Sequence, residues 1–145
     1  VGKTLVYSLD LQNLYAEVIG FNSYMLQREI EFIKKHKVLF NAIKKIENIP
    51  YISSVILFGS YSKGTETTKS DVDLICLSYK KKETEHFVKS LRHEYNFEFA
   101  PVVLQPHEFP NIKKDNLALW NDLKIYGVVF KEGDYFYWMY KDGKN

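Results

Sequence analysis

The sequence has little of several features that would point to a particular class of protein. It holds a single cysteine, Cys76, so no disulfide can form within the chain. The apolar run around this thiol, LICL, predicts a buried and inert side chain. No apolar run approaches the length of a membrane span, and the four histidines are scattered without metal-ligand spacing. We therefore expect a reducing, cytoplasmic setting with no signal peptide and no membrane partner.

The sequence also has no large excess of charge of either sign. The 20 Lys and Arg residues nearly balance the 18 Asp and Glu residues, and the net charge is +2 with a pI near 8.5. This is far from the strongly basic composition of a dedicated nucleic-acid binder. Apolar residues make up 46% and aromatic residues 16% of the 145 residues, which suits one domain with an ordinary core.

Hydrophobic periodicity predicts alternating helices and strands. Helical spacing is present over residues 14–47 (with a break near 20–23), 83–95 and 106–126. Strand-like runs are present over residues 1–9, 52–58, 71–78, 97–104, 127–133 and 135–140. Pro101 indicates that the 97–104 strand is an edge strand or carries a bulge. We expect an α/β or α+β fold with a small mixed β-sheet flanked by helices.

The chemistry lies in residues 56–75, ILFGSYSKGTETTKSDVDLI. Gly59 follows a predicted strand and lacks a Cβ, so a ligand can approach its backbone closely. Ser60 offers a hydroxyl and a backbone N–H at the expected start of a helix, which suits a phosphate group. Asp71 and Asp73 are two apart in a predicted strand, so they project to one face with Cα atoms about 6–7 Å apart.

Two ionised carboxylates at this distance repel each other, and a bound divalent cation would remove that cost. Ligands that are all oxygen favour Mg²⁺ or Mn²⁺ over zinc. A phosphate site beside such a cation indicates a nucleoside triphosphate. The alternative is a turn followed by two exposed aspartates at a strand edge. It leaves unexplained why two charges stand at the head of an apolar strand.

The order Gly59-Ser60, Lys63-Gly64 and then Ser70-Asp71-Val72-Asp73-Leu74 resembles the signature of the DNA-polymerase-beta-like nucleotidyltransferase superfamily, in particular its small, minimal members. The resemblance implies a nucleoside triphosphate, ATP above all, with Mg²⁺ or Mn²⁺ as cofactor. The implied phosphate-binding residues are Gly59, Ser60, Lys63 and Ser70. The implied catalytic and metal-binding residues are Asp71, Asp73 and Glu98.

Glu98 is the only acid on the strand where the family places its third carboxylate. It either completes the metal site or is a solvent-facing strand residue. In-line nucleotidyl transfer uses two metal ions about 3.5–4 Å apart and needs the additional ligand. If Glu98 does not supply it, the site binds nucleotide and metal but catalyses poorly.

The resemblance implies an enzyme that moves a nucleoside monophosphate from a triphosphate to an acceptor hydroxyl. Minimal members lack a large acceptor domain, so a protein partner is expected, either a helical toxin of a toxin–antitoxin pair or a second copy of the chain. The first alternative is a weak or inactive nucleotide-binding or interaction module of a transcriptional regulator or antitoxin. The second is a structural role with a vestigial site.

The domain prediction separates residues 1–13, an N-terminal strand or linker, from a nucleotidyltransferase-like domain over residues 14–145. GKTLVYSLD in the first segment resembles the wing strand of a winged-helix DNA-binding domain, as in archaeal regulators fused to a nucleotidyltransferase. An ordinary N-terminal strand explains it equally well. Because the chain opens Val1-Gly2 without an initiator Met, we expect a fragment or a processed form, with DNA bound only through a missing N-terminal domain.

Overall fold

The computed structural model describes residues 23–131. Its strands are β1 (Ile52–Phe58), β2 (Val72–Ser78), β3 (Phe99–Leu104) and β4 (Val128–Lys131). Its helices are residues 23–35, α2 (Lys37–Glu47), α3 (Ser60–Lys63), α4 (Lys81–Ser90), α5 (Arg92–Tyr95), the 3-10 turn η1 (Pro106–Glu108), α6 (Asn111–Asp115) and α7 (Leu117–Tyr126). The strands predicted at residues 1–9 and 135–140, and the wing-like segment with them, lie outside the described residues.

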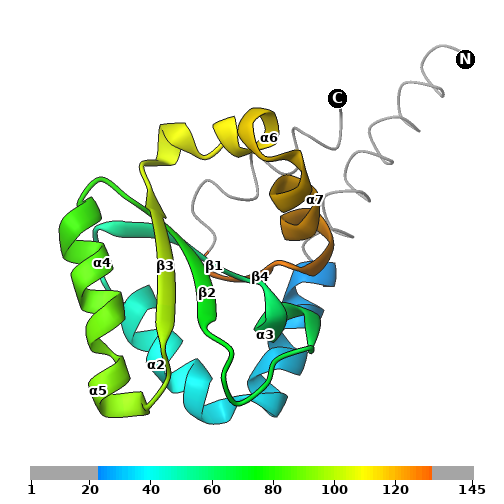
Figure 1. Ribbon diagram of the computed structural model, residues 1–145, viewed down its shortest axis with the longest axis vertical. Coiled ribbons are helices and arrows are strands. Elements are labelled where there is room, and N and C mark those ends of the chain that lie inside the picture. Colours follow the sequence, from blue (N-terminus) through cyan, green and yellow to red (C-terminus); the bar gives the residue numbers. More distant parts are fainter. Residues whose placement is uncertain (1–22, 132–145) are drawn as a thin grey trace, which may run out of the picture.

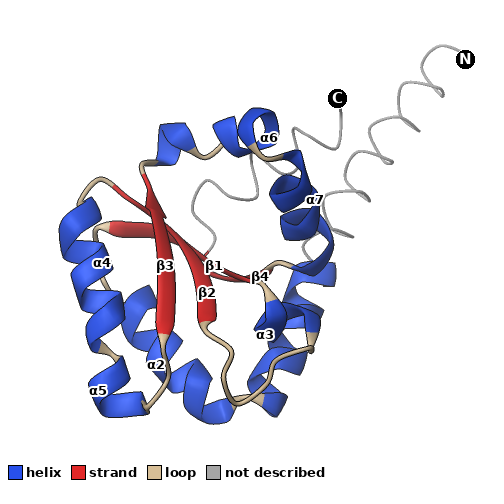
Figure 2. Cartoon of the chain, in the orientation of Figure 1, coloured by secondary structure: helices blue, strands red, loops and turns tan. Residues whose placement is uncertain are grey.

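The sheet of the described chain is mixed, as predicted, with the strand order β3-β2-β1-β4 (Figure 2). β1 pairs antiparallel with both β2 and β4, and β2 pairs parallel with β3. Helices α2 and α4 cover one face, and α6 and α7 lie against the other (Figure 1). Pro101 is on β3, which forms an edge of this sheet, so the prediction of an edge strand is confirmed. The α+β fold class is confirmed as well.

Burial on both faces explains the apolar run of β2. Leu74 and Cys76 pack in the core cluster with α2, whereas Ile75 and Leu77 pack in the cluster with α6 and α7. Cys76 has no exposed surface, which confirms that the thiol is buried, and burial raises its pKa to about 12. The same alternation directs Asp73 toward the α7 face of the sheet.

Two helical segments are broken where periodicity alone predicts continuity. The first helix breaks at His36 (φ −130°, ψ 60°), between residues 23–35 and α2. Residues 106–126 form three pieces, and α6 is separated from α7 because the backbone leaves the helical region at Asn116 (φ −149°, ψ 79°). The side chain of Asn116 caps α7 by accepting the N–H of Leu119 at 3.1 Å. No helix within residues 23–131 is both long and apolar enough to cross a membrane.

Candidate functional site

The end of β1 and the start of β2 lie side by side at one end of the sheet, because the two strands are antiparallel. Phe58, the last residue of β1, lies opposite Asp73. Gly59 therefore follows directly beside this carboxylate. A Cβ added to Gly59 would come within 3.0 Å of Asp73 Cγ and closer still to its Oδ2. The glycine also has φ 74° and ψ −153°, a conformation that essentially only glycine adopts.

Asp71 and Asp73 stand at the head of β2. Asp71 is exposed and precedes the strand, whereas Asp73 is half-buried within it. Burial raises the pKa of Asp73, and the nearby charge of Asp71 raises it further. Ionising Asp73 in the folded protein therefore costs free energy, and a cation between the two carboxylates would reduce that cost.

Helix α3 begins at Ser60, with Gly59 as its N-cap. The helix is one turn long: the N–H of Lys63 donates to the Gly59 carbonyl at 3.1 Å. Gly64 ends it in the left-handed conformation, with φ 74° and ψ 21°. The structure thus brings the Gly59-Ser60 segment beside Asp73, which follows in the next strand.

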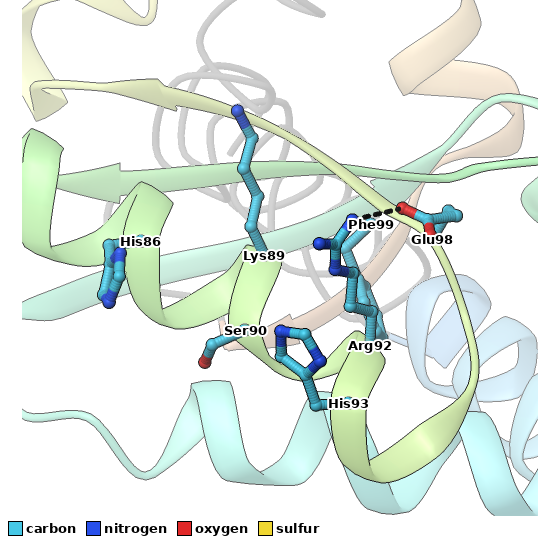
Figure 3. Close-up of a pocket in the computed structure, with 7 residues that line it drawn as sticks. All are labelled: His86, Lys89, Ser90, Arg92, His93, Glu98 and Phe99. Carbon is cyan, nitrogen blue, oxygen red and sulfur yellow. Dashed lines mark ion pairs between the residues drawn. The ribbon is translucent and has the colours of Figure 1, made fainter.

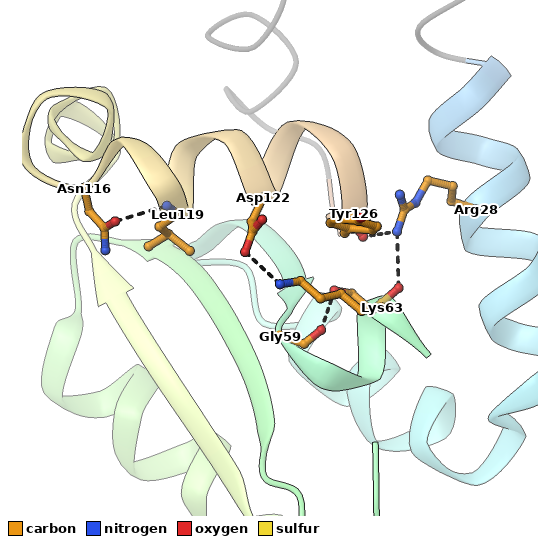
Figure 4. A network of polar contacts seen from close by, with 8 residues as sticks. Arg28, Gly59, Lys63, Asn116, Leu119, Asp122 and Tyr126 are labelled. Atoms are coloured by element: carbon orange, nitrogen blue, oxygen red, sulfur yellow. Dashed lines mark hydrogen bonds and ion pairs between the residues drawn. The ribbon is translucent and has the colours of Figure 1, made fainter. Parts of the chain in front are cut away.

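Lys63 lies on the side of α3 that faces α7 (Figure 4). Its Nζ is 2.8 Å from Asp122 Oδ2 and 5.4 Å from the centre of the Tyr126 ring. The hydrogen bond with Asp122 raises the pKa of Lys63. Lys63 would have to leave Asp122 to reach a phosphate group. Sequence reasoning missed Asp122, because nothing in the order of residues joins it to the motif.

A further contact that the sequence did not predict holds α3 in place. Arg28 donates to the carbonyl oxygens of Ile125 and Tyr126 at the end of α7, and to that of Ser62 at 3.4 Å (Figure 4). The Arg28 side chain therefore ties the first described helix to both α3 and α7. It also lines a pocket with Ser62, Lys63 and Gly64.

The loop between α3 and β2 contains Ser70, predicted as a phosphate-binding residue. Its Oγ accepts the N–H of Thr67 at 2.9 Å, so in this structure it closes the loop before Asp71. Glu66, in the same loop, turns inward: its Oε1 is 3.2 Å from His36 Nε2, and its Oε2 is buried without a hydrogen-bond partner. Burial lowers the pKa of His36 despite the nearby Glu66 charge.

Glu98, predicted as the third metal ligand, does not join the aspartates. Its carboxylate is 65% exposed and lies 3.8 Å from Arg92 of α5 (Figure 3). It lines a pocket with His86, Lys89, Ser90, Arg92, His93 and Phe99. Its backbone is nevertheless beside the pair, because its carbonyl accepts the N–H of Val72 at 2.8 Å. In residues 23–131 no three His, Cys, Asp or Glu side chains gather in a way that could hold a metal ion.

The residues present fit one magnesium ion with a triphosphate better than they fit a two-metal centre. Asp71 and Asp73 supply hard oxygen ligands, and Mg²⁺ is commonly bound by one or two carboxylates together with substrate phosphates. The space beside Asp73, which a side chain at position 59 would fill, is left open by Gly59. A third carboxylate is missing from the described part of the site.

Comparisons with known proteins place the chain among others of similar sequence. Residues 37–120 match the family described as nucleotidyltransferase domain. A protein of Methanocaldococcus jannaschii that carries the provisional name protein adenylyltransferase is 26% identical over 91 residues, which cover 57% of this chain and 61% of that protein. The chain thus spans about three fifths of the length of that curated relative.

Two solved structures are similar to the chain at a low level. One is a toxin–antitoxin with AMP-PNP, with 20% identity and a TM-score of 0.49 over 70% of this chain and 81% of that one. The other is a mutant of the toxin–antitoxin MntA–HpeT, with 19% identity, a TM-score of 0.49 and the same coverage. The family match begins at residue 37, so it does not bear on the wing-like segment at residues 1–9.

Proposed function

The chain belongs to the nucleotidyltransferase domain family, and we propose that its Gly59-Ser60 and Asp71–Asp73 segments form one site for a nucleoside triphosphate and Mg²⁺. The observation that carries this proposal is the contact between Gly59 and Asp73, where even a methyl group would collide with the carboxylate. A glycine in this place keeps the backbone of the phosphate segment open beside the carboxylate pair.

Asp71 and Asp73 hold the cation, which when bound neutralises the paired carboxylates and withdraws charge from the phosphate oxygens. Gly59 allows a phosphate group to approach the backbone, and the Ser60 hydroxyl can donate to it. Since a metal ligand must be ionised, the raised pKa of Asp73 makes cation binding weaken as the pH falls.

The proposed reaction transfers a nucleoside monophosphate to an acceptor hydroxyl. The acceptor oxygen forms a bond to the α-phosphorus, the bond from the α-phosphorus to the bridging oxygen breaks, and pyrophosphate leaves while the hydroxyl proton is released to solvent or a base. The name of the Methanocaldococcus relative supports ATP as the donor and a protein hydroxyl as the acceptor.

A second candidate is a nucleotide-binding module with slow or no turnover. The position of Glu98 favours it, because this side chain pairs with Arg92 and leaves the aspartates with no third carboxylate from β3. Both candidates require the same nucleotide site, and they differ in whether pyrophosphate is released.

Calorimetric titration of MgATP tests the shared site. We expect saturable binding to the wild type that requires magnesium and is at least about tenfold weaker in the Asp71→Asn/Asp73→Asn variant, a loss of about 1.4 kcal/mol or more. Asp115→Asn, which neutralises an exposed carboxylate at the end of α6, is the matched control and should bind like the wild type. Undiminished binding by the double variant, or none by the wild type, contradicts the proposal.

A labelled-ATP assay then separates the two candidates. Wild-type protein with ATP labelled at the α-phosphate is mixed with candidate protein acceptors, and pyrophosphate release and label on protein are followed. Label transfer that is lost in Asp71→Asn/Asp73→Asn supports the transferase. Tight MgATP binding with no pyrophosphate released under any condition supports the binding module.

A further inference from the structure

The strand beside β2 decides how many carboxylates can meet at the aspartate pair. β3 runs parallel to β2, with Ala100 opposite Asp73 and Val102 opposite Ile75. Side chains opposite each other on neighbouring strands point to the same side of the sheet. Leu104, two residues further along β3, accordingly packs against the same cluster as Ile75. The β3 position next to the Asp73 carboxylate is therefore Ala100.

Neither strand neighbour of Asp73 can ligate a metal. On β1 the neighbour is Phe58, and on β3 it is Ala100. Glu98 comes before β3 begins and continues the register beside Asp71, because its carbonyl accepts the N–H of Val72. Its side chain, however, extends to Arg92 and is 65% exposed. The described part of the site thus holds two carboxylates, both from the head of β2.

We infer that this site takes one divalent cation with its nucleotide, and that Ala100 is the residue that sets this number. The inference rests on the proposed nucleotide site. In two-metal centres the ions lie about 3.5–4 Å apart, and each needs ligands of its own as well as shared ones. Asp71 and Asp73 suffice for one ion that also binds the triphosphate.

The number of carboxylates also limits which residue can take the proton of the acceptor hydroxyl. With one cation, no third His, Cys, Asp or Glu side chain of residues 23–131 gathers with the aspartates to act as a base for an acceptor hydroxyl. Nucleotide binding and turnover therefore separate in this chain: binding needs only the β2 pair, while fast transfer needs a carboxylate or other base from outside the described residues.

The substitution Ala100→Asp tests the inference by adding a carboxylate opposite Asp73. Val102→Asp is a matched control, because it adds the same charge to the same face of β3 but opposite Ile75; Val102 is 41% exposed, so the charge remains hydrated there. Ala100→Asn is a second control, which has the size of aspartate without its charge. Glu98→Gln tests whether Glu98, the third metal ligand implied by the sequence, binds a cation.

The measurement is the number of Mn²⁺ ions bound per nucleotide-bound chain, by equilibrium dialysis with a saturating non-hydrolysable ATP analogue. We expect one ion for the wild type, Val102→Asp, Ala100→Asn and Glu98→Gln, and two for Ala100→Asp. Thermal unfolding with and without Mn²⁺ verifies folding, and Mn²⁺ should raise the melting temperature of Ala100→Asp more than that of the wild type.

Two ions in the wild type, or a count that falls in Glu98→Gln, overturns the inference even if Ala100→Asp does not fold. A folded Ala100→Asp variant that still binds one ion also overturns it. No ion in the wild type is a different result: it refutes the proposed nucleotide and metal site itself, and the inference falls with it.

Discussion

Replacing Gly59 by alanine adds one methyl group at the point where the two segments of the candidate site meet. The backbone there has φ 74° and ψ −153°, which costs a residue with a side chain about 1–3 kcal/mol. The new Cβ would also lie 3.0 Å from Asp73 Cγ and 3.2 Å from its Cβ. The carboxylate must rotate away, so the proposed metal ligand Asp73 is displaced from its place beside Asp71.

Gly64→Ala is the matched control, because Gly64 has the same φ of 74° and ends the same helix. Its ψ of 21° places it in the left-handed helical region, where a side chain costs about 1–2 kcal/mol. Among the described residues, a Cβ at position 64 would meet only Lys35 Nζ at 3.7 Å, an ordinary contact. Gly64→Ala therefore carries the backbone strain without the collision at Asp73.

Urea unfolding and MgATP titration of both variants separate the two effects. We expect both to lose stability, Gly59→Ala by about 1–3 kcal/mol more, since overpacking adds a penalty of that order to the strain. MgATP affinity should fall by about tenfold or more in Gly59→Ala only, which corresponds to about 1.4 kcal/mol. If Gly59→Ala binds MgATP as tightly as Gly64→Ala does, the contact of Gly59 with Asp73 does not shape the site.

Two further predictions concern stability. Burial, with a smaller effect of Glu29, raises the pKa of Glu47 from 4.5 to about 7, so its contribution to stability is full below pH 4.5 and is lost as the pH rises through 7. Glu47→Gln should remove this loss and stabilise the protein by about 1–2 kcal/mol at pH 8, after allowance for partial exposure, and by less at pH 5. Urea unfolding of the variant and the wild type at both pH values measures the gain. Equal gains at pH 5 and pH 8 would contradict the prediction. Glu66→Ala removes the carboxylate 3.2 Å from His36 and should cost about 1–2 kcal/mol. Glu66→Gln, which keeps an acceptor, should cost less; equal losses in thermal unfolding would refute this role.

The strands of the motif were predictable because local signals and tertiary demands agree there. Residues 52–58 contain the apolar run from Val55 to Phe58, and β1 spans all seven of them. The run after Asp73 is apolar on both faces, and β2 is buried on both. Such runs leave few places for two charges, which is why the aspartates at the head of β2 stood out in the sequence.

The supports of the site were not predictable, because their partners are distant in the chain. Arg28 meets the carbonyls of Ile125 and Tyr126 about a hundred residues later, and Lys63 meets Asp122. The break at His36 had no glycine or proline to mark it. It is stabilised by packing, since the His36 ring lies 4.8 Å from that of Phe32, and by Glu66 of the loop.

The third carboxylate shows why register matters more than composition at this site. The sequence points to Glu98 as the acid of its strand, and an extended chain could place it on either side of the pair. The register decides otherwise: β3 begins at Phe99 opposite Val72, so the side chain next to Asp73 is that of Ala100. A shift of two residues between β2 and β3 would have put Glu98 opposite Asp73. The strand pairing, which no local signal encodes, therefore decides which β3 side chain lies next to Asp73.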